Sequence, residues 1–295
     1  MKQIDLKFLL KKIMRWLLRG NDRGLSPIGL LVSKSLNFLR FSVAEARLEW
    51  ANSLPTTPKP RWRAPNGETI FYDLGANEGQ NISYYLSMGF RVVAVEASSN
   101  LCELIRGQFA PEIASGKLMV LQMAITEEEC DFVEFSLNLE NPKMSGINPP
   151  YRSENNIRVS VPAITLERLT KQYGTPFGVK IDIEGLDAAI VNCIRSLPKA
   201  PAYVSAEIHD IGVLSALVKS GYDRFKVVEG SLVGSGILEN VGSPNDLYKF
   251  PRDSAGPFCE DVPGPWYSAD AIFEYLWTNG LGWKDVHAKH SSVVD

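Results

Sequence analysis

From Thr69 onward, runs of apolar residues alternate with segments whose apolar residues recur at helical spacing. Five apolar runs predict strands: TIFYDL from Thr69, RVVAVE from Arg91, LMVLQMAI from Leu118, GVKIDI from Gly178 and AYVSAEIH from Ala202. Helices are expected between them, around residues 82–88, after Asn100-x-x-Glu103 and after Gly185. This alternation predicts an α/β fold with a doubly wound, mostly parallel, Rossmann-like sheet that binds ligands at the carboxyl ends of its strands.

Both ends of the chain differ from this pattern. Residues 1–20 predict a basic amphipathic helix that packs on its own domain, on a partner subunit or peripherally on an anionic membrane surface. Ser26-Pro27 resembles the start of a second helix, and the proline-rich residues 53–62 read as a linker. We therefore expect an N-terminal helical arm and linker at 1–60, a catalytic domain at 61–250, and a cover loop and helix at 251–295.

The cover segment contains a proline- and glycine-rich loop at 251–267, after which Ser268 is expected to cap a helix through Trp277. The loop is either a lid, with Asp261 and Trp266 in contact with a bound substrate, or a strap that packs the last helix in place. His287 and His290 follow in a polar stretch and are expected to be exposed.

Composition narrows the class of protein. The chain has 295 residues, 45% of them hydrophobic and 22% charged, with a net charge of −3. A soluble globular protein fits these values, and a nucleic-acid substrate does not, because it usually requires a basic surface. The four cysteines are scattered without a C-x-x-C pair, which favours a reducing cytoplasm over a disulfide framework.

The loop after the first strand reads Asp73-Leu74-Gly75-Ala76-Asn77-Glu78-Gly79, and it lacks the G-x-G-x-x-G of dinucleotide-binding domains. D-x-G-x-x-x-G instead suits S-adenosylmethionine, because glycines let the backbone approach the ligand and helix N–H groups face its carboxylate. Glu96, an acid at the end of the second strand, is placed to accept hydrogen bonds from both ribose hydroxyls. The residues expected to hold this cofactor are Asp73, Gly75, Asn77, Gly79, Asn81, Glu96, Ala97, Ala124 and Asp182.

Ionisable residues follow the fourth and fifth predicted strands. Alternation places Asp182 and Glu184 on one face, and Glu207 and His209 on one face of the next strand. We expect these four side chains to converge as the catalytic group, with His209 as the candidate base, because methyl transfer from a sulfonium requires an aligned acceptor and removal of its proton. Such ligands would suit magnesium or manganese, but no spacing demands a metal and none is assigned.

The tetrapeptide Asn148-Pro149-Pro150-Tyr151 matches the motif with which amino-directed methyltransferases hold a planar nitrogen. That motif follows the fourth strand directly, whereas here Pro142 and Gly146 precede it and the fourth strand begins only at Gly178. We therefore interpret the tetrapeptide as a loop, since proline and asparagine are common turn residues.

DLGANEG at 73–79, VEAS at 95–98, ITLERL at 164–169, KIDIEG at 180–185 and AEIH at 206–209 resemble the FkbM-type S-adenosylmethionine-dependent methyltransferases. The resemblance covers most of residues 69–230 and implies a seven-stranded sheet and methylation of a hydroxyl oxygen on a small molecule, sugar or glycolipid. It departs where a proline would be expected after Glu96. An N-methyltransferase that uses Asn148 to Tyr151, and a non-catalytic binding module, remain the alternatives.

Overall fold

The computed structural model describes residues 63–149, 156–233, 250–251 and 253–294. The chain divides into two units, Met1–Ser53 and Leu54–Asp295, and all described residues belong to the second. The expected N-terminal helices and the linker up to Trp62 lie outside the described residues.

The described helices and strands alternate at the five predicted strands, whereas β3 to β6 follow one another without an α-helix between them. They are β1 (Ile70–Leu74), α3 (Ile82–Ser87), β2 (Arg91–Glu96), α4 (Ser99–Gln108), α5 (Ala110–Ala114), β3 (Leu118–Gln122), β4 (Ala124–Thr126), β5 (Phe132–Asn138), β6 (Asn156–Thr165), α6 (Leu166–Tyr173), β7 (Gly178–Ile181), α7 (Asp187–Cys193), β8 (Tyr203–Glu207), α8 (Gly212–Lys219), β9 (Tyr222–Glu229), α9 (Ala269–Asn279) and β10 (Lys284–His290). Short 3-10 turns lie at Pro142–Met144, Ile194–Ser196, Gly230–Leu232 and Cys259–Asp261.

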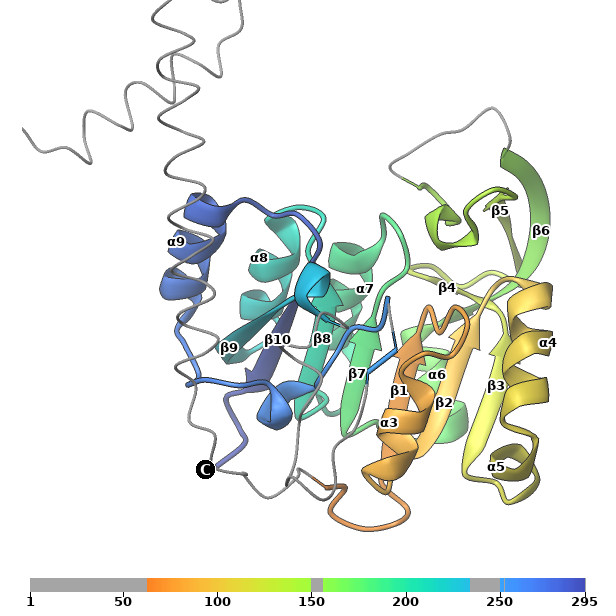
Figure 1. The fold of residues 1–295 in the computed structure, drawn as a ribbon, viewed down its shortest axis with the longest axis horizontal. Coiled ribbons are helices and arrows are strands. Elements are labelled where there is room, and N and C mark those ends of the chain that lie inside the picture. The colour runs from red at the N-terminus through yellow and green to blue at the C-terminus, as the bar shows by residue number, and fades with distance from the viewer. Residues whose placement is uncertain (1–62, 150–155, 234–249, 252, 295) are drawn as a thin grey trace, which may run out of the picture. The chain divides into compact units, whose positions relative to one another are not determined.

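The main sheet has seven strands in the order β3-β2-β1-β7-β8-β10-β9 (Figure 1). The first five are parallel, and β10 runs antiparallel to both of its neighbours. The five strands predicted from the sequence are β1, β2, β3, β7 and β8, so the expected fold class is confirmed. Because β1 lies between β2 and β7, the strand order reverses beside it, and α/β sheets bind ligands at such a point.

A smaller sheet, in the order β4-β6-β5, stands beside the carboxyl ends of β2 and β3 (Figure 1). The predicted third strand, LMVLQMAI, is divided between the two sheets, because β3 ends at Gln122 and β4 begins at Ala124. The long β5 and β6 pair antiparallel from Phe132 opposite Pro162 to Asn138 opposite Asn156. The insertion between β3 and β7 thus forms a wall over one end of the main sheet.

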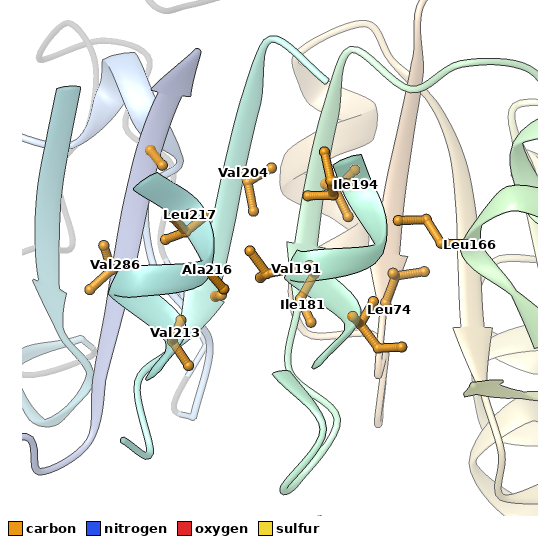
Figure 2. Packing of buried hydrophobic residues seen from close by; sticks show 14 of the residues in the cluster. Leu74, Leu166, Ile181, Val191, Ile194, Val204, Val213, Ala216, Leu217 and Val286 are labelled. Carbon is orange, nitrogen blue, oxygen red and sulfur yellow. The ribbon is translucent and has the colours of Figure 1, made fainter. Parts of the chain in front are cut away.

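Side-chain alternation along the central strands builds two cores, one on each face of the main sheet. Tyr72 and Leu74 of β1 pack into the cluster that includes α6, α7, α8 and α9, whereas Phe71 packs against α3 and the segment around Phe258. Figure 2 shows the first cluster, where Val191 of α7 and residues of α8 such as Leu217 lie against β7, β8 and β10. Each such fully buried aliphatic side chain contributes roughly 1.5–3 kcal/mol.

The last strand corrects the expectation for the C-terminal residues. β10 lies between β8 and β9, so residues 284–290 belong to the main sheet and not to a separate cover. The expected exposure of His287 is wrong: this residue is 1% exposed, because the segment at Phe258 and Cys259 covers its face of the strand. His290, at the end of the strand, is half-buried.

Of two helix starts predicted from the sequence, one is confirmed and one is wrong. The hydroxyl of Ser268 accepts a hydrogen bond from the Ala271 N–H and caps α9, as expected. The start of α4 is at Ser99, so Asn100 and Glu103 lie inside the helix and do not form the expected capping box.

Among the described helices, none has the length and apolar character that crossing a membrane would require.

Candidate functional site

A cavity of about 320 Å³ opens at the carboxyl ends of β1, β2 and β7, with the smaller sheet and its 141–147 loop on the opposite side. Most of the expected site residues line this cavity. They are Gly75, Asn77, Glu96, Ala97, Ala124, Asp182, Glu184 and Glu207. The structure therefore brings the predicted cofactor and catalytic residues together around one space.

The loop after β1 needs glycine at its first position. Gly75 has φ +79°, and a Cβ built there would lie 1.8 Å from the Asp182 carbonyl oxygen. The Gly75 N–H donates to the Val95 carbonyl, and the Asp182 N–H donates to the Leu74 carbonyl. These contacts hold the loop across the ends of β2 and β7, where it forms part of the cavity wall.

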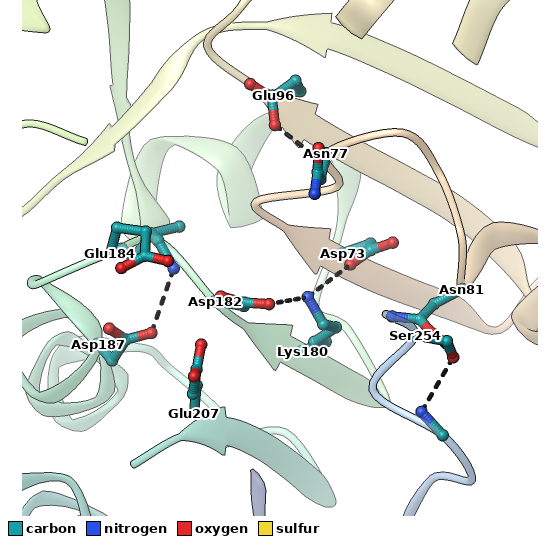
Figure 3. A network of polar contacts seen from close by, with 12 residues as sticks. Asp73, Asn77, Asn81, Glu96, Lys180, Asp182, Glu184, Asp187, Glu207 and Ser254 are labelled. Atoms are coloured by element: carbon teal, nitrogen blue, oxygen red, sulfur yellow. Dashed lines mark hydrogen bonds and ion pairs between the residues drawn. The ribbon is translucent and has the colours of Figure 1, made fainter. Parts of the chain in front are cut away.

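Glu96 ends β2 and presents a fixed carboxylate to the cavity. Its Oε2 accepts a hydrogen bond from the Asn77 N–H at 2.9 Å (Figure 3), and its Oε1 accepts one from the Ser98 N–H at 2.8 Å. Burial raises the pKa of Glu96 to about 6, although these backbone donors favour its charged form. A carboxylate has about four lone-pair positions, so each oxygen can accept a further hydrogen bond from a ligand.

Behind the cavity, Lys180 of β7 is buried between two carboxylates (Figure 3). Its Nζ donates to Asp182 Oδ2 at 2.9 Å and lies 3.8 Å from Asp73 Oδ1. Burial alone would lower the pKa of Lys180, but Asp182, Asp73 and Asp285 together hold it above its ordinary value. Burial raises the pKa of Asp73 to about 6, with Lys180 partly offsetting it. Lys180 thus neutralises part of the negative charge of Asp73 and Asp182.

The remaining ionisable residues gather beside Asp182, where β7 and β8 end. His209 Nε2 lies 3.8 Å from Glu184 Oε2, 3.7 Å from Asp187 Oδ2 and 3.5 Å from Glu207 Oε2. The expected convergence is therefore present, but strand alternation does not produce it at Glu184. β7 ends at Ile181, and Glu184 has φ 46° in the turn that follows.

The pKa values of this group reflect burial among like charges. Burial, together with the nearby Asp182 carboxylate, raises the pKa of Glu184 to about 7 and that of Asp187 to about 7. The same causes raise the pKa of Glu207. Burial lowers the pKa of His209, which favours its neutral form. The group thus prefers to carry less negative charge than its residue types would have in water.

Three predicted cofactor residues do not line the cavity. Asp73 lies beneath it with Lys180, and Asn81 accepts a hydrogen bond from the Ser254 hydroxyl (Figure 3). A Cβ on Gly79 would meet the side chains of Ile82, Phe109 and Ile105, so this glycine serves close packing. Each of the three supports the loop that does reach the cavity.

The cover segment mainly contacts the core, although Asp253 and Trp283 line the cavity. The Tyr84 hydroxyl donates to Asp261 at 2.7 Å, and the Trp266 ring N–H donates to Glu260 at 3.1 Å. Neither Asp261 nor Trp266 lines the cavity, so the structure favours a packing strap over the expected acceptor contacts.

The sequence reading missed three residues of the charged group: Lys180, Asp187 and Asp285. Lys180 could have been found as a cation in the middle of an apolar strand. Asp187 begins α7, and its Oδ1 accepts from the Ile183 N–H. Asp285 lies opposite Glu207 in β10, and it could be found only by recognising a buried strand in KDVHAKH.

The described part of the Asn148–Tyr151 tetrapeptide, Asn148 and Pro149, lies between β5 and β6 and does not line the cavity. The strand beside β1 is β7, as predicted, so the tetrapeptide does not follow the fourth strand of the main sheet. Pro150 and Tyr151 lie outside the described residues.

The strand order, the single antiparallel strand next to the edge and the cavity at the point of reversal define a class I methyltransferase fold. No protein-family model and no curated protein matches the chain.

The solved structures to which the chain is similar include two precorrin-6Y C5,15-methyltransferases. The enzyme from Geobacter metallireducens is 11% identical, with 76% of this chain and 80% of that chain covered and a TM-score of 0.36. The C-terminal domain from Rhodobacter capsulatus is 10% identical, with 78% and 82% covered and a TM-score of 0.38. A Burkholderia thailandensis 1,6-didemethyltoxoflavin-N1-methyltransferase is 10% identical, with 92% and 94% covered and a TM-score of 0.33. Likenesses this distant establish neither an activity nor a substrate.

Proposed function

We propose that the protein is an S-adenosylmethionine-dependent methyltransferase that acts on a hydroxyl oxygen of a small molecule or carbohydrate-containing acceptor. The observation that carries the proposal is the Glu96 carboxylate, which two backbone N–H groups hold on the cavity wall. The free lone pairs of its two oxygens match the paired hydroxyls of a ribose.

The other cavity residues fit the rest of the donor. Ala97 and Ala124 leave room beside Glu96 for a flat adenine ring, and Gly75 lets the loop backbone approach a ligand closely. Asp182 offers a carboxylate to the cationic end of the donor. A volume of about 320 Å³ is within the range of small-molecule sites.

The bound donor supplies an electrophilic methyl group, and the protein must align the acceptor and remove its proton. The acceptor oxygen forms a bond to the methyl carbon as the carbon–sulfur bond breaks, and the hydroxyl proton passes to a nearby base. Asp182 and Glu207 line the cavity, and His209 Nε2 lies 3.5 Å from Glu207 Oε2. His209 is the best base of the three, because burial lowers its pKa and favours its neutral form. Burial and the Asp182 carboxylate raise the pKa of Glu207, and Lys180 lowers the pKa of Asp182 despite its burial. Oxygen is favoured over nitrogen because Asn148 is not among the residues that line the cavity.

Purified protein should be incubated with methyl-labelled donor and matched pairs of hydroxyl and amine acceptors, including sugars and glycolipids. We expect labelled product and S-adenosylhomocysteine with a hydroxyl acceptor, and unchanged turnover in Asn148→Ala. Label on amines that is lost in Asn148→Ala would identify an N-methyltransferase. Donor binding without turnover on any acceptor would favour the non-catalytic binding module.

A further inference from the structure

Four ionisable side chains beside the cavity come from two short segments, 184–187 and 207–209, and face one point. Glu184 follows β7, Asp187 begins α7, Glu207 ends β8 and His209 follows β8. One ligand atom each of Glu184, Glu207 and His209 lies within 4.8 Å of the other two. Figure 3 shows Glu184, Asp187 and Glu207 around the carboxyl ends of β7 and β8.

Three atoms of this group are buried and have no hydrogen-bond partner: Glu184 Oε2, Asp187 Oδ2 and His209 Nε2. Asp187 is only 2% exposed, and its other carboxyl oxygen accepts from the Ile183 N–H, which fixes the direction of the unpartnered oxygen. A buried polar atom without a partner costs about 1–3 kcal/mol, and more when it is charged. Three such atoms in one place are suited to bind a ligand.

The distances distinguish hydrogen bonding from coordination. His209 Nε2 is 3.5–3.8 Å from the three carboxylate oxygens, whereas a hydrogen bond would require about 2.7–3.2 Å. Two atoms that each lie about 2.2 Å from one cation, at an angle of about 90–110°, are about 3.1–3.6 Å apart. The observed spacing is therefore close to that of ligands around a single cation.

The charge of the neighbouring residues also favours a bound cation. Lys180 is paired with Asp182 and Asp73, and among the residues that the structure describes no lysine or arginine forms an ion pair with Glu184, Asp187 or Glu207. A divalent cation would neutralise carboxylates that are otherwise buried close together.

We propose that Glu184, Glu207 and His209, with Asp187 as a further ligand, bind a divalent cation of the first transition row. The imidazole nitrogen favours such a cation over magnesium, and the carboxylate oxygens favour manganese among them. The spacing of these residues in the sequence does not demand a metal, but the fold brings their ligand atoms together.

The position of the site gives the cation a role that rests on the proposed function. Glu184 and Glu207 also line the cavity, so the cation faces an acceptor bound there. A hydroxyl that coordinates it becomes more acidic. His209 is then a ligand and not the base, and the more acidic hydroxyl releases its proton to solvent.

Cation binding is tested without donor or acceptor, so that its failure is distinct from failure of the proposed methyl transfer. Full-length protein stripped with a chelator is titrated with MnCl₂, and free Mn²⁺ is followed by electron paramagnetic resonance. The variants are Glu184→Gln and His209→Gln. Glu274→Gln, at an exposed acid on α9, and His290→Gln, at a half-buried histidine, are the matched controls. Circular dichroism identifies the variants that fold.

We expect one Mn²⁺ per chain in the parent and both controls, and at least tenfold weaker binding in each folded site variant. Manganese should also raise the melting temperature of the parent but not of the site variants. Absence of a saturable site in the parent below about 1 mM Mn²⁺ would overturn the proposal. Parent-like affinity in either folded site variant would do the same, and if one variant does not fold, the other decides.

Discussion

Glu96→Gln is the most direct perturbation of the proposed donor site. In the parent, both carboxyl oxygens of Glu96 accept backbone hydrogen bonds, from the Asn77 N–H at 2.9 Å and the Ser98 N–H at 2.8 Å. Glutamine keeps the shape but has one oxygen, so its NH₂ group must face one of these donors or the ribose. Hydrogen bonds to a charged group contribute about 1.5–3 kcal/mol each. Losing about 2–3 kcal/mol should raise the donor Kd roughly 30- to 150-fold.

The same substitution should leave the empty protein nearly as stable as the parent. Burial raises the pKa of Glu96 from 4.5 to about 6, so ionisation at pH 7 costs about 2 kcal/mol of stability, a cost that is absent below pH 4.5 and complete above pH 6. Glutamine removes this cost but sets one NH₂ group against a donor, which costs about 1–3 kcal/mol. The two effects offset each other, and the free energy of unfolding should change by about 1 kcal/mol or less.

Titration calorimetry with S-adenosylmethionine, alongside urea unfolding, measures both quantities. Glu103→Gln, at an exposed acid on the neighbouring α4, is the matched control and should bind like the parent. The parent affinity should fall as the pH drops below about 6, where Glu96 takes up a proton, and the Glu96→Gln affinity should not. Parent-like affinity in a folded Glu96→Gln protein would refute the assignment of Glu96 to the ribose.

Gly75→Ala should abolish donor binding in calorimetry and lower stability by several kcal/mol, because its Cβ would lie 1.8 Å from the Asp182 carbonyl oxygen. His287 should make the parent less stable in acid: burial lowers its pKa to about 3, so between that pH and about 6.5 only the unfolded chain takes up the proton. Urea unfolding should show that the parent loses about 2 kcal/mol more than His287→Asn between pH 7 and pH 5. Lys180→Met leaves Asp73 and Asp182 without their cation and should cost about 3–5 kcal/mol at pH 8 but less at pH 5, as melting curves at both pH values will show.

The central strands were predictable because burial on both faces leaves a signal in the local sequence. Runs such as RVVAVE are apolar throughout, and a strand between two helical layers requires that pattern. Glu96 was predictable for the same reason, since an acid that directly follows such a run must lie at the carboxyl end of its strand. The glycine loop at 73–79 was predictable because only glycine tolerates the φ of +79° that Gly75 adopts against a neighbouring backbone.

β10 was not predictable from local pattern, because its charged residues are neutralised by segments distant in the sequence. Lys289, for example, lies 3.1 Å from Glu260, and Lys284 lies 3.4 Å from Glu229. A run such as KDVHAKH therefore looks solvent-exposed until its partners are known. Asp285 and the buried state of His287 were missed with it.

The convergence of Asp182, Glu184, Glu207 and His209 was predicted for a reason that is only partly correct. Alternation placed Asp182 and Glu184 together, but the turn at Glu184 and Gly185 brings the Glu184 carboxylate to its position. The contribution of Asp187 depends on how α7 starts after that turn, which short-range periodicity does not encode. Convergence of side chains from three elements is a property of the tertiary fold.

The position of β10 also determines the order in which the sheet can be completed. β8 and β9 are synthesised long before the strand that separates them, so each exposes an unpaired edge until β10 has been made. A nascent chain must keep these edges from pairing with other chains. Truncation before Lys284 would make that exposure permanent, and aggregation, more than simple loss of activity, is the expected fate of such fragments.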